Sequence, residues 1–101
     1  MQRISEDLTI YPDKIELSPE LWDKYLDHLG HHPEDLGWAN PQHLPDQGYH
    51  TVTLFEDGTA EAKKQVGVNT VTDMLMDRFH DPEDWGEVKQ ELIQLAPEVR
   101  Q

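Results

Sequence analysis

The chain has 101 residues and a formal net charge of −13, because 21 Asp and Glu stand against eight Lys and Arg. Nucleic acids and anionic membranes are bound through basic patches, so the sequence predicts no direct nucleic-acid binding and no membrane binding. A basic protein or nucleoprotein is the partner that this charge favours. The absence of cysteine excludes disulfides, thiolate metal sites and cysteine nucleophiles.

The length predicts a single domain over residues 1–101. Three Trp, three Tyr and two Phe are spread along the chain, which is typical of a folded protein rather than a disordered tail. Residues 1–6 lack the basic start and apolar run of a signal peptide, and no apolar run approaches the ~20 residues of a membrane span. We therefore expect a cytoplasmic protein.

The first elements expected are two short strands, at residues 7–11 and 14–17, where apolar and polar residues alternate. Ser18-Pro19-Glu20 then predicts a helix start, with a hydroxyl cap, proline in the first turn and an acid at the positive end of the dipole. Apolar residues recur at helical spacing up to Gly30, which is placed to end the helix: Leu21, Trp22, Tyr25, Leu26 and Leu29. Ser5 is expected to lie in a frayed terminus.

Residues 31–47 predict an irregular loop, with one helical turn at 33–36, because prolines, Gly37 and Asn40 punctuate the segment. Loops of this length in small domains are often functional. Trp38 either pins this loop to the body or, as an exposed aromatic side chain, serves as an interface hot spot.

The clearest hairpin runs from Tyr49 to Val66, with Glu56-Asp57-Gly58 as its turn. Its returning strand is polar, and its two lysines favour a place near a sheet edge.

Two further helices are expected after the hairpin. One begins at Asn69 or Thr70, with an apolar stripe of Val71, Met74, Leu75 and Phe79. The other begins at Asp81-Pro82 and ends at Pro97, with an apolar stripe of Trp85, Val88, Leu92 and Leu95 or Ala96. Together these elements predict an α+β fold: a small antiparallel sheet of three to four short strands, with two to three helices packed on one face.

No catalytic constellation stands out. His28, His31, His32 and His43 cluster, but Gly30 interrupts the helical spacing that would bring His28 and His32 to one metal. We favour solvent-exposed histidines there and leave metal binding open. We interpret Ser18 as a helix cap rather than a nucleophile, and the paired carboxylates as helix caps or solvated surface rather than catalytic acids. The sequence contains no glycine-rich phosphate-binding loop. We expect a protein that is not an enzyme and has no cofactor.

Three explanations of the acidity remain. The chain presents an acidic face that imitates nucleic acid in a basic groove of its partner, it is an acidic adaptor or regulatory subunit, or it is adapted to a salty cytoplasm. In size and charge alone the chain resembles the small acidic proteins that inhibit restriction or CRISPR nucleases in this way. We take the first explanation as the prediction.

The predicted binding face combines Trp38 with acidic residues that recur every three or four positions across the Pro82 junction. These acids are Asp73, Asp77, Asp81, Asp84, Glu87 and Glu91. The alternative interpretation is a solvated helix face without a partner.

Overall fold

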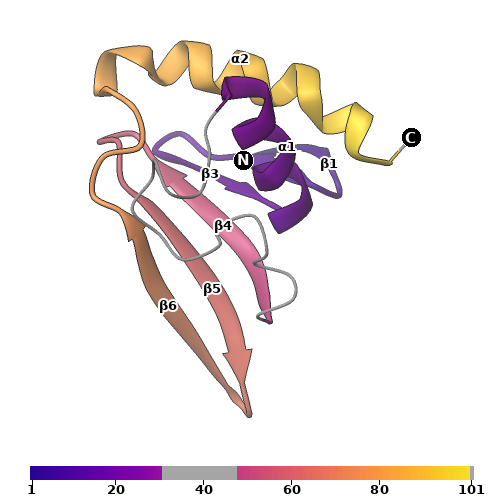
Figure 1. The fold of residues 1–101 in the computed structure, drawn as a ribbon, viewed down its shortest axis with the longest axis vertical. Helices are drawn as coiled ribbons and strands as arrows, with labels where there is room; N and C mark the ends of the chain where they lie inside the picture. The colour runs from indigo at the N-terminus through magenta and orange to yellow at the C-terminus, as the bar shows by residue number, and fades with distance from the viewer. Residues whose placement is uncertain (31–47, 101) are drawn as a thin grey trace.

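The computed structural model describes residues 1–30 and 48–100 (Figure 1). These residues contain six strands: β1 (Gln2–Ser5), β2 (Leu8–Ile10), β3 (Lys14–Leu17), β4 (Tyr49–Phe55), β5 (Ala60–Val66) and β6 (Asn69–Met76). The helices are α1 (Pro19–Leu29) and α2 (Trp85–Leu95), with 3-10 helices η4 (Pro82–Asp84) before α2 and η5 (Ala96–Arg100) after it.

The strands form one antiparallel sheet in which the spatial order is the chain order, β1-β2-β3-β4-β5-β6. One face of the sheet carries two apolar rows across the strands. The first row is Leu8, Leu17, Val52 and Ala62, and the second is Ile10, Ile15, Leu54 and Ala60. The opposite face carries the row Thr9, Glu16, Thr53, Glu61 and Met74. Because side chains alternate along a strand, one face is apolar and the other mostly polar.

Both α-helices cover the apolar face and complete a single core (Figure 1). α1 contributes Leu21, Trp22, Tyr25 and Leu26, all at most 2% exposed. α2 contributes its apolar stripe, Trp85, Val88, Leu92 and Leu95, as the sequence predicted. The hairpin of β5 and β6 runs on beyond the helices and projects from the body (Figure 1).

The local signals around α1 are confirmed. The Ser18 hydroxyl accepts a hydrogen bond from the Leu21 amide at 3.1 Å, and Pro19 opens the helix. Gly30 ends it in a left-handed conformation with φ of 75°. The same Ser18 hydroxyl donates to the Asp7 carboxylate at 2.7 Å, and Asp7 is only 1% exposed.

The α+β class is confirmed, but the described part of the chain forms a sheet of six strands rather than three or four. The helix predicted from Asn69 or Thr70 is wrong, because residues 69–76 form β6 and pair with β5. Gly67, with φ of 62°, opens the two-residue turn between Val66 and Asn69. A glycine at that position and the β-branched residues after it favour a hairpin, and pairing along β5 stabilises it over a helix.

The structure also decides two smaller expectations at the sheet edges. Ser5 belongs to β1, which pairs with β2, so residues 2–5 are not a frayed terminus. The expectation for the returning strand of the hairpin is confirmed, because β5 lies next to the edge strand β6.

The start of the last helix differs in detail from the prediction. Asp81 is extended and makes no side-chain capping bond, and Pro82 opens the 3-10 helix η4 before α2 begins at Trp85. Pro97 does not end the helical segment, because it lies inside η5, which follows α2 directly. The loop predicted over 31–47, with its helical turn at 33–36, lies outside the described residues. In the described ranges, no helix combines the length and apolar character that crossing a membrane requires.

Candidate functional site

A cleft of about 380 Å³ opens between α1, the connection from β6 to α2, and α2 itself. Four carboxylates line it: those of Asp81, Asp84, Glu87 and Glu91. The other lining residues are Tyr25, Leu29, Arg78, Phe79, His80 and Val88. We call this feature the acidic cleft.

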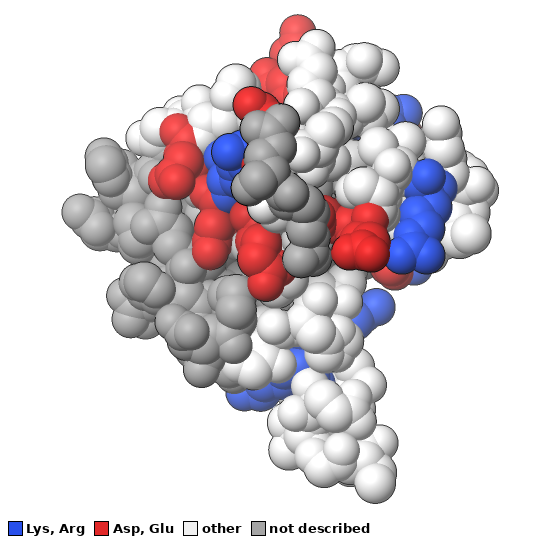
Figure 2. Space-filling view, turned by 90° about the vertical axis from the view of Figure 1, so that its right-hand side faces the viewer, with Lys and Arg blue, Asp and Glu red and all other residues white. Residues whose placement is uncertain are grey.

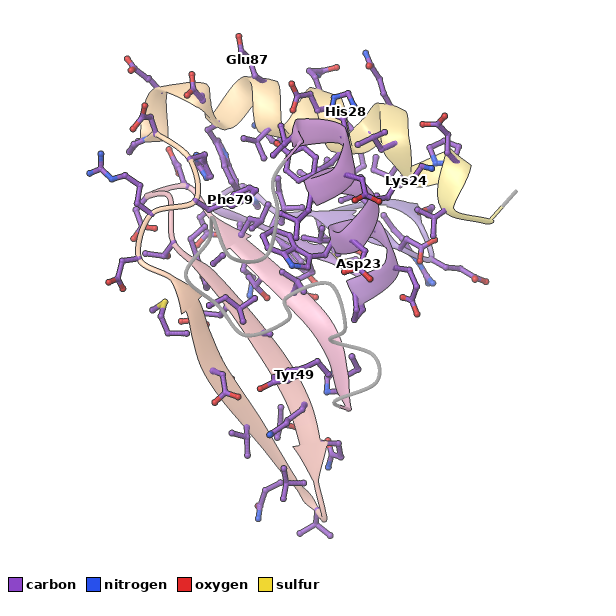
Figure 3. All side chains as sticks on the ribbon, viewed as in Figure 1. Asp23, Lys24, His28, Tyr49, Phe79 and Glu87 are labelled. Carbon is purple, nitrogen blue, oxygen red and sulfur yellow. The ribbon has the colours of Figure 1, made fainter. Side chains whose placement is uncertain are left out.

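Helical geometry brings three of the four acids together. Glu87 and Glu91 are four residues apart on α2, and Asp84 stands three residues before Glu87 at the N-cap, so all three lie toward one side of the helix. The neighbouring stripe of α2 is buried in the core, which fixes the rotation of the helix. Glu87 accordingly points away from the sheet at the outer side of α2 (Figure 3). Asp81 reaches the same cleft from the extended residue before Pro82.

Aromatic side chains form the inner wall of the acidic cleft. The Phe79 ring lies beside α1, with its centroid 5.7 Å from that of Tyr25 and 4.9 Å from that of Trp22 (Figure 3). Both pairs are tilted, a favoured geometry for aromatic contacts. The cleft therefore combines an acidic rim with a partly apolar wall.

The β4–β5 turn positions this wall. The Phe79 amide donates to the Gly58 carbonyl at 2.6 Å. Gly58 has φ of 101°, and the space that a Cβ would need there is filled by the backbone carbonyl of His80. Glycine is required at this position because only a residue without Cβ lets the two backbones approach so closely.

His80 ties the turn to the start of α2 through its ring. Nε2 lies 3.0 Å from the Phe55 carbonyl oxygen and Nδ1 lies 2.8 Å from the Asp81 carbonyl oxygen. Both partners are acceptors, so a neutral imidazole satisfies one of them and an imidazolium satisfies both. The ring also stacks on Trp85, with centroids 5.4 Å apart.

The pKa of the Tyr25 hydroxyl reflects the negative charge around the cleft. The hydroxyl donates to Glu91 Oε2 at 3.1 Å, linking α1 to α2. Burial raises the pKa of this hydroxyl well above its usual value of 10, and the charge of Glu91 and its hydrogen bond add to the rise. The negative charges of Asp84 and Glu87 raise the pKa further, which marks a negative potential at this wall.

One cation stands at the rim among the described residues that line the cleft. Arg78 Nη1 lies 3.4 Å from Asp81 Oδ1, and both side chains are more than half exposed. An exposed ion pair of this kind contributes little to stability and is easily exchanged for another partner. Four carboxylates against one guanidinium leave the cleft strongly negative.

Of the six acids predicted as a band, Asp81, Asp84, Glu87 and Glu91 come together in the cleft. Asp73 and Asp77 do not line it, since residues 69–76 form a strand rather than a helix. Asp73 lies on β6 and accepts a short hydrogen bond from the Tyr49 hydroxyl, which raises the pKa of Tyr49. Tyr49 stands near the far end of β4, away from α2 (Figure 3).

Other sequence candidates are placed away from any reactive arrangement or lie outside the described residues. Trp38, His31, His32 and His43 belong to the segment that the structure does not describe. His28 is exposed in the last turn of α1, with its ring 6.5 Å from that of Tyr25. Within residues 1–30 and 48–100, no three His, Asp or Glu side chains gather as a metal site would require.

Sequence reasoning missed the walls of the cleft. It assigned Tyr25 and Phe79 to apolar stripes and gave Arg78 and His80 no role. The close approach of Gly58 to residues 79 and 80 brings these side chains together, and no local pattern encodes that approach.

An acidic rim above aromatic rings suits the binding of a cationic side chain, since carboxylates pair with guanidinium or ammonium groups and aromatic faces attract them. No family model, curated protein or solved structure matches the chain. The function must therefore be argued from this site and from the charge of the whole chain.

Proposed function

We propose that this protein is an inhibitor that docks its acidic cleft on a basic, nucleic-acid-binding surface of another protein. It has no catalytic activity of its own in this proposal, and it competes with nucleic acid for the partner. The observation that carries the proposal is the gathering of Asp81, Asp84, Glu87 and Glu91 around one cleft, in a chain of net charge −13.

The spacing of the cleft acids supports mimicry of a phosphate backbone. At 1.5 Å rise per residue, Asp84, Glu87 and Glu91 stand roughly 5 Å apart along the helix axis. Phosphates follow one another every 3.4 Å along one strand of B-DNA, so the two charge densities are of the same order. A row of Arg or Lys side chains that binds phosphates is able to pair with these carboxylates as well.

The aromatic wall supports arginine as the favoured contact. A guanidinium is planar and stacks on aromatic rings while its N–H groups bond to carboxylates. The partly buried Phe79 offers a ring at the wall of the cleft, and the four acids offer the acceptors. The charge of the rest of the chain would steer a basic partner toward this protein, with association that weakens as salt rises.

A competition experiment tests the proposal. Nucleic-acid-binding proteins from a lysate of the producing cells are loaded on immobilised DNA, and purified protein is added at low salt. We expect the protein to release a defined subset of the bound proteins. The variant Asp84→Asn/Glu87→Gln should release much less, because it removes two cleft charges without removing a side-chain capping bond of α2.

The matched control is Asp13→Asn/Glu98→Gln, which removes the same amount of charge from exposed positions outside the cleft. It should release the same proteins as the unchanged chain. Equal loss of release in the two double variants would mean that only total charge matters, and the cleft would then have no specific role. Failure of the unchanged chain to release any protein would refute the proposal.

A further inference from the structure

We infer that β6 is a dimerisation strand, which pairs antiparallel with β6 of a second copy of this chain. The inference does not depend on the acidic cleft. Of the part of the chain that the structure describes, no strand pairs with the outer edge of β6, where the order of the sheet ends. Antiparallel pairing uses alternate residues, so about half of the backbone N–H and C=O groups of β6 point away from β5 and remain available for another strand.

β6 carries little of the usual protection of an edge strand along residues 69–74, because the irregularity in its pairing with β5 falls at Leu75, beyond that stretch. It contains neither lysine nor proline, and its one charged residue is Asp73. The two lysines of the hairpin, Lys63 and Lys64, lie on β5, one strand inside the edge. The part of this edge strand before Leu75, with Asp73 as its one charge, is a template for pairing with another chain.

The hairpin tip is also the place where two acidic chains are able to meet. Residues 65–72 contain no charged residue, although 29% of the whole chain is charged. Figure 2 shows this tip as an uncoloured projection below the acidic and basic side chains of the body. Its apolar side chains face solvent: Val66 is 50% exposed and Val68 is 94% exposed, and farther along β6 Met74 is 55% exposed.

The sequence of this segment identifies the partner as a second copy. Residues 68–74 read Val-Asn-Thr-Val-Thr-Asp-Met, a pattern that is symmetric in side-chain character about Val71. An antiparallel partner is read in the opposite direction, so a symmetric pattern is complementary to itself. Around a two-fold axis at Val71, Thr70 faces Thr72 and Asn69 faces Asp73.

Each of these pairs is favourable in a sheet. Opposed threonines stabilise antiparallel pairing, and an asparagine amide donates to a carboxylate. At the ends of the pairing, Val68 of one copy meets Met74 of the other, which covers the two most exposed apolar side chains of the segment. No like charges face each other in this register.

The pairing also keeps the two acidic bodies apart. The core reaches β6 at Leu75, which packs partly buried against it. Four residues separate Leu75 from Val71, or about 13 Å of strand. The two Leu75 residues therefore lie about 26 Å apart along the ribbon, while the Debye length at about 0.15 M salt is only about 8 Å. Repulsion between acidic residues that follow Leu75 in the two copies is largely screened under these conditions.

Analytical ultracentrifugation of the full chain tests the inference. We expect a monomer–dimer equilibrium in the unchanged protein that strengthens as salt rises from about 0.01 M to about 0.15 M, because the Debye length falls from about 30 Å to about 8 Å. A monomer at every concentration up to the millimolar range, at the higher salt, would overturn the inference.

Two substitutions at one exposed site test the register. Asn69→Lys places an ammonium opposite Asp73 of the other copy, twice per dimer, and should strengthen dimerisation by about 2- to 30-fold. Asn69→Asp places like charges there and should weaken dimerisation by a similar factor. The controls are Gln2→Lys and Gln2→Asp, which make the same changes in net charge on β1 at the opposite edge of the sheet.

The controls should change dimerisation by less than the Asn69 variants do. If both Asn69 variants shift the equilibrium no more than their Gln2 counterparts, or if the aspartate variant dimerises more tightly than the lysine variant, the proposed pairing is wrong. Circular dichroism of each variant establishes that the monomer fold is retained.

Discussion

The backbone of Gly58 and the carbonyl group of His80 are in contact at the point where the β4–β5 turn supports the connection to α2. Gly58 itself is buried, with φ of 101°. Together with the hydrogen bonds from Phe79 to Gly58 and from His80 to Phe55, this contact holds the segment that carries Phe79, His80 and Asp81 into the acidic cleft close to the sheet.

Replacing Gly58 by alanine should therefore lower the stability strongly. The added Cβ would collide with the His80 carbonyl, and the positive φ is strained for any other residue. We expect a loss of about 3 kcal/mol or more in the free energy of unfolding, measured by urea denaturation. Gly48→Ala is the control, since Gly48 has φ of 90° but no atom within 4 Å of the position that a Cβ would take. Equal losses in the two variants would show that the contact with His80 is unimportant.

Ser18→Ala should lower the free energy of unfolding by more than the loss of an ordinary helix cap does. The hydroxyl caps the Leu21 amide and also donates to the buried carboxylate of Asp7. Loss of a cap costs about 1 kcal/mol, and loss of a hydrogen bond to a charged group costs about 1.5–3 kcal/mol. We therefore expect a total loss of about 2.5–4 kcal/mol in the free energy of unfolding, measured by thermal or urea unfolding. Ser18→Thr keeps the hydroxyl and should retain most of the stability. A cost of only about 1 kcal/mol for alanine would show that the bond to Asp7 adds nothing.

Tyr25→Phe should remove a pH-dependent contribution to stability. The pKa of the Tyr25 hydroxyl is raised in the folded state by burial and by Glu91, so its contribution is fully present below a pH of about 10, the ordinary tyrosine value. As pH rises above that value, the unfolded chain loses the proton first, and stability falls.

The two proteins are compared by urea unfolding from neutral to alkaline pH. At neutral pH the phenylalanine variant should be less stable by about 1 kcal/mol, because the hydrogen bond to Glu91 is lost. The difference should shrink above a pH of about 10. A difference that stays constant through the alkaline range would contradict the raised pKa.

The protein should unfold cooperatively on heating at ordinary salt, near ~0.15 M, where the Debye length is about 8 Å. One continuous apolar core joins both helices to the sheet, and the burial of apolar surface stabilises a fold at ordinary ionic strength. The midpoint, followed by circular dichroism, should rise only modestly with more salt. A chain that folds only near ~1 M salt, where the Debye length is about 3 Å, would instead favour adaptation to a salty cytoplasm.

Local chemistry in the sequence determined much of the first half of the fold and the last helix. Ser18, Pro19 and Gly30 mark the two ends of α1, and the alternation at residues 14–17 gives β3. The Glu56-Asp57-Gly58 turn and the buried stripe of α2 were equally predictable. Each of these signals depends only on residues within one turn or one element. The local sequence is therefore enough to predict the elements that they mark.

Tertiary structure decided the rest because it depends on pairing between distant residues. The spacing of Val71, Met74, Leu75 and Phe79 fits a helix, yet pairing with β5 makes residues 69–76 a strand. β1 likewise exists through its pairing with β2 and contains a single apolar residue, too few for a recognisable alternation. The acidic cleft is of the same kind: helical spacing grouped Asp84, Glu87 and Glu91, whereas the Gly58 contact and the packing of α1 brought Phe79, His80 and Tyr25 to them. Which residues lie opposite one another in a sheet depends on the order and register of all its strands. The spacing of apolar residues within one segment does not predict that pairing.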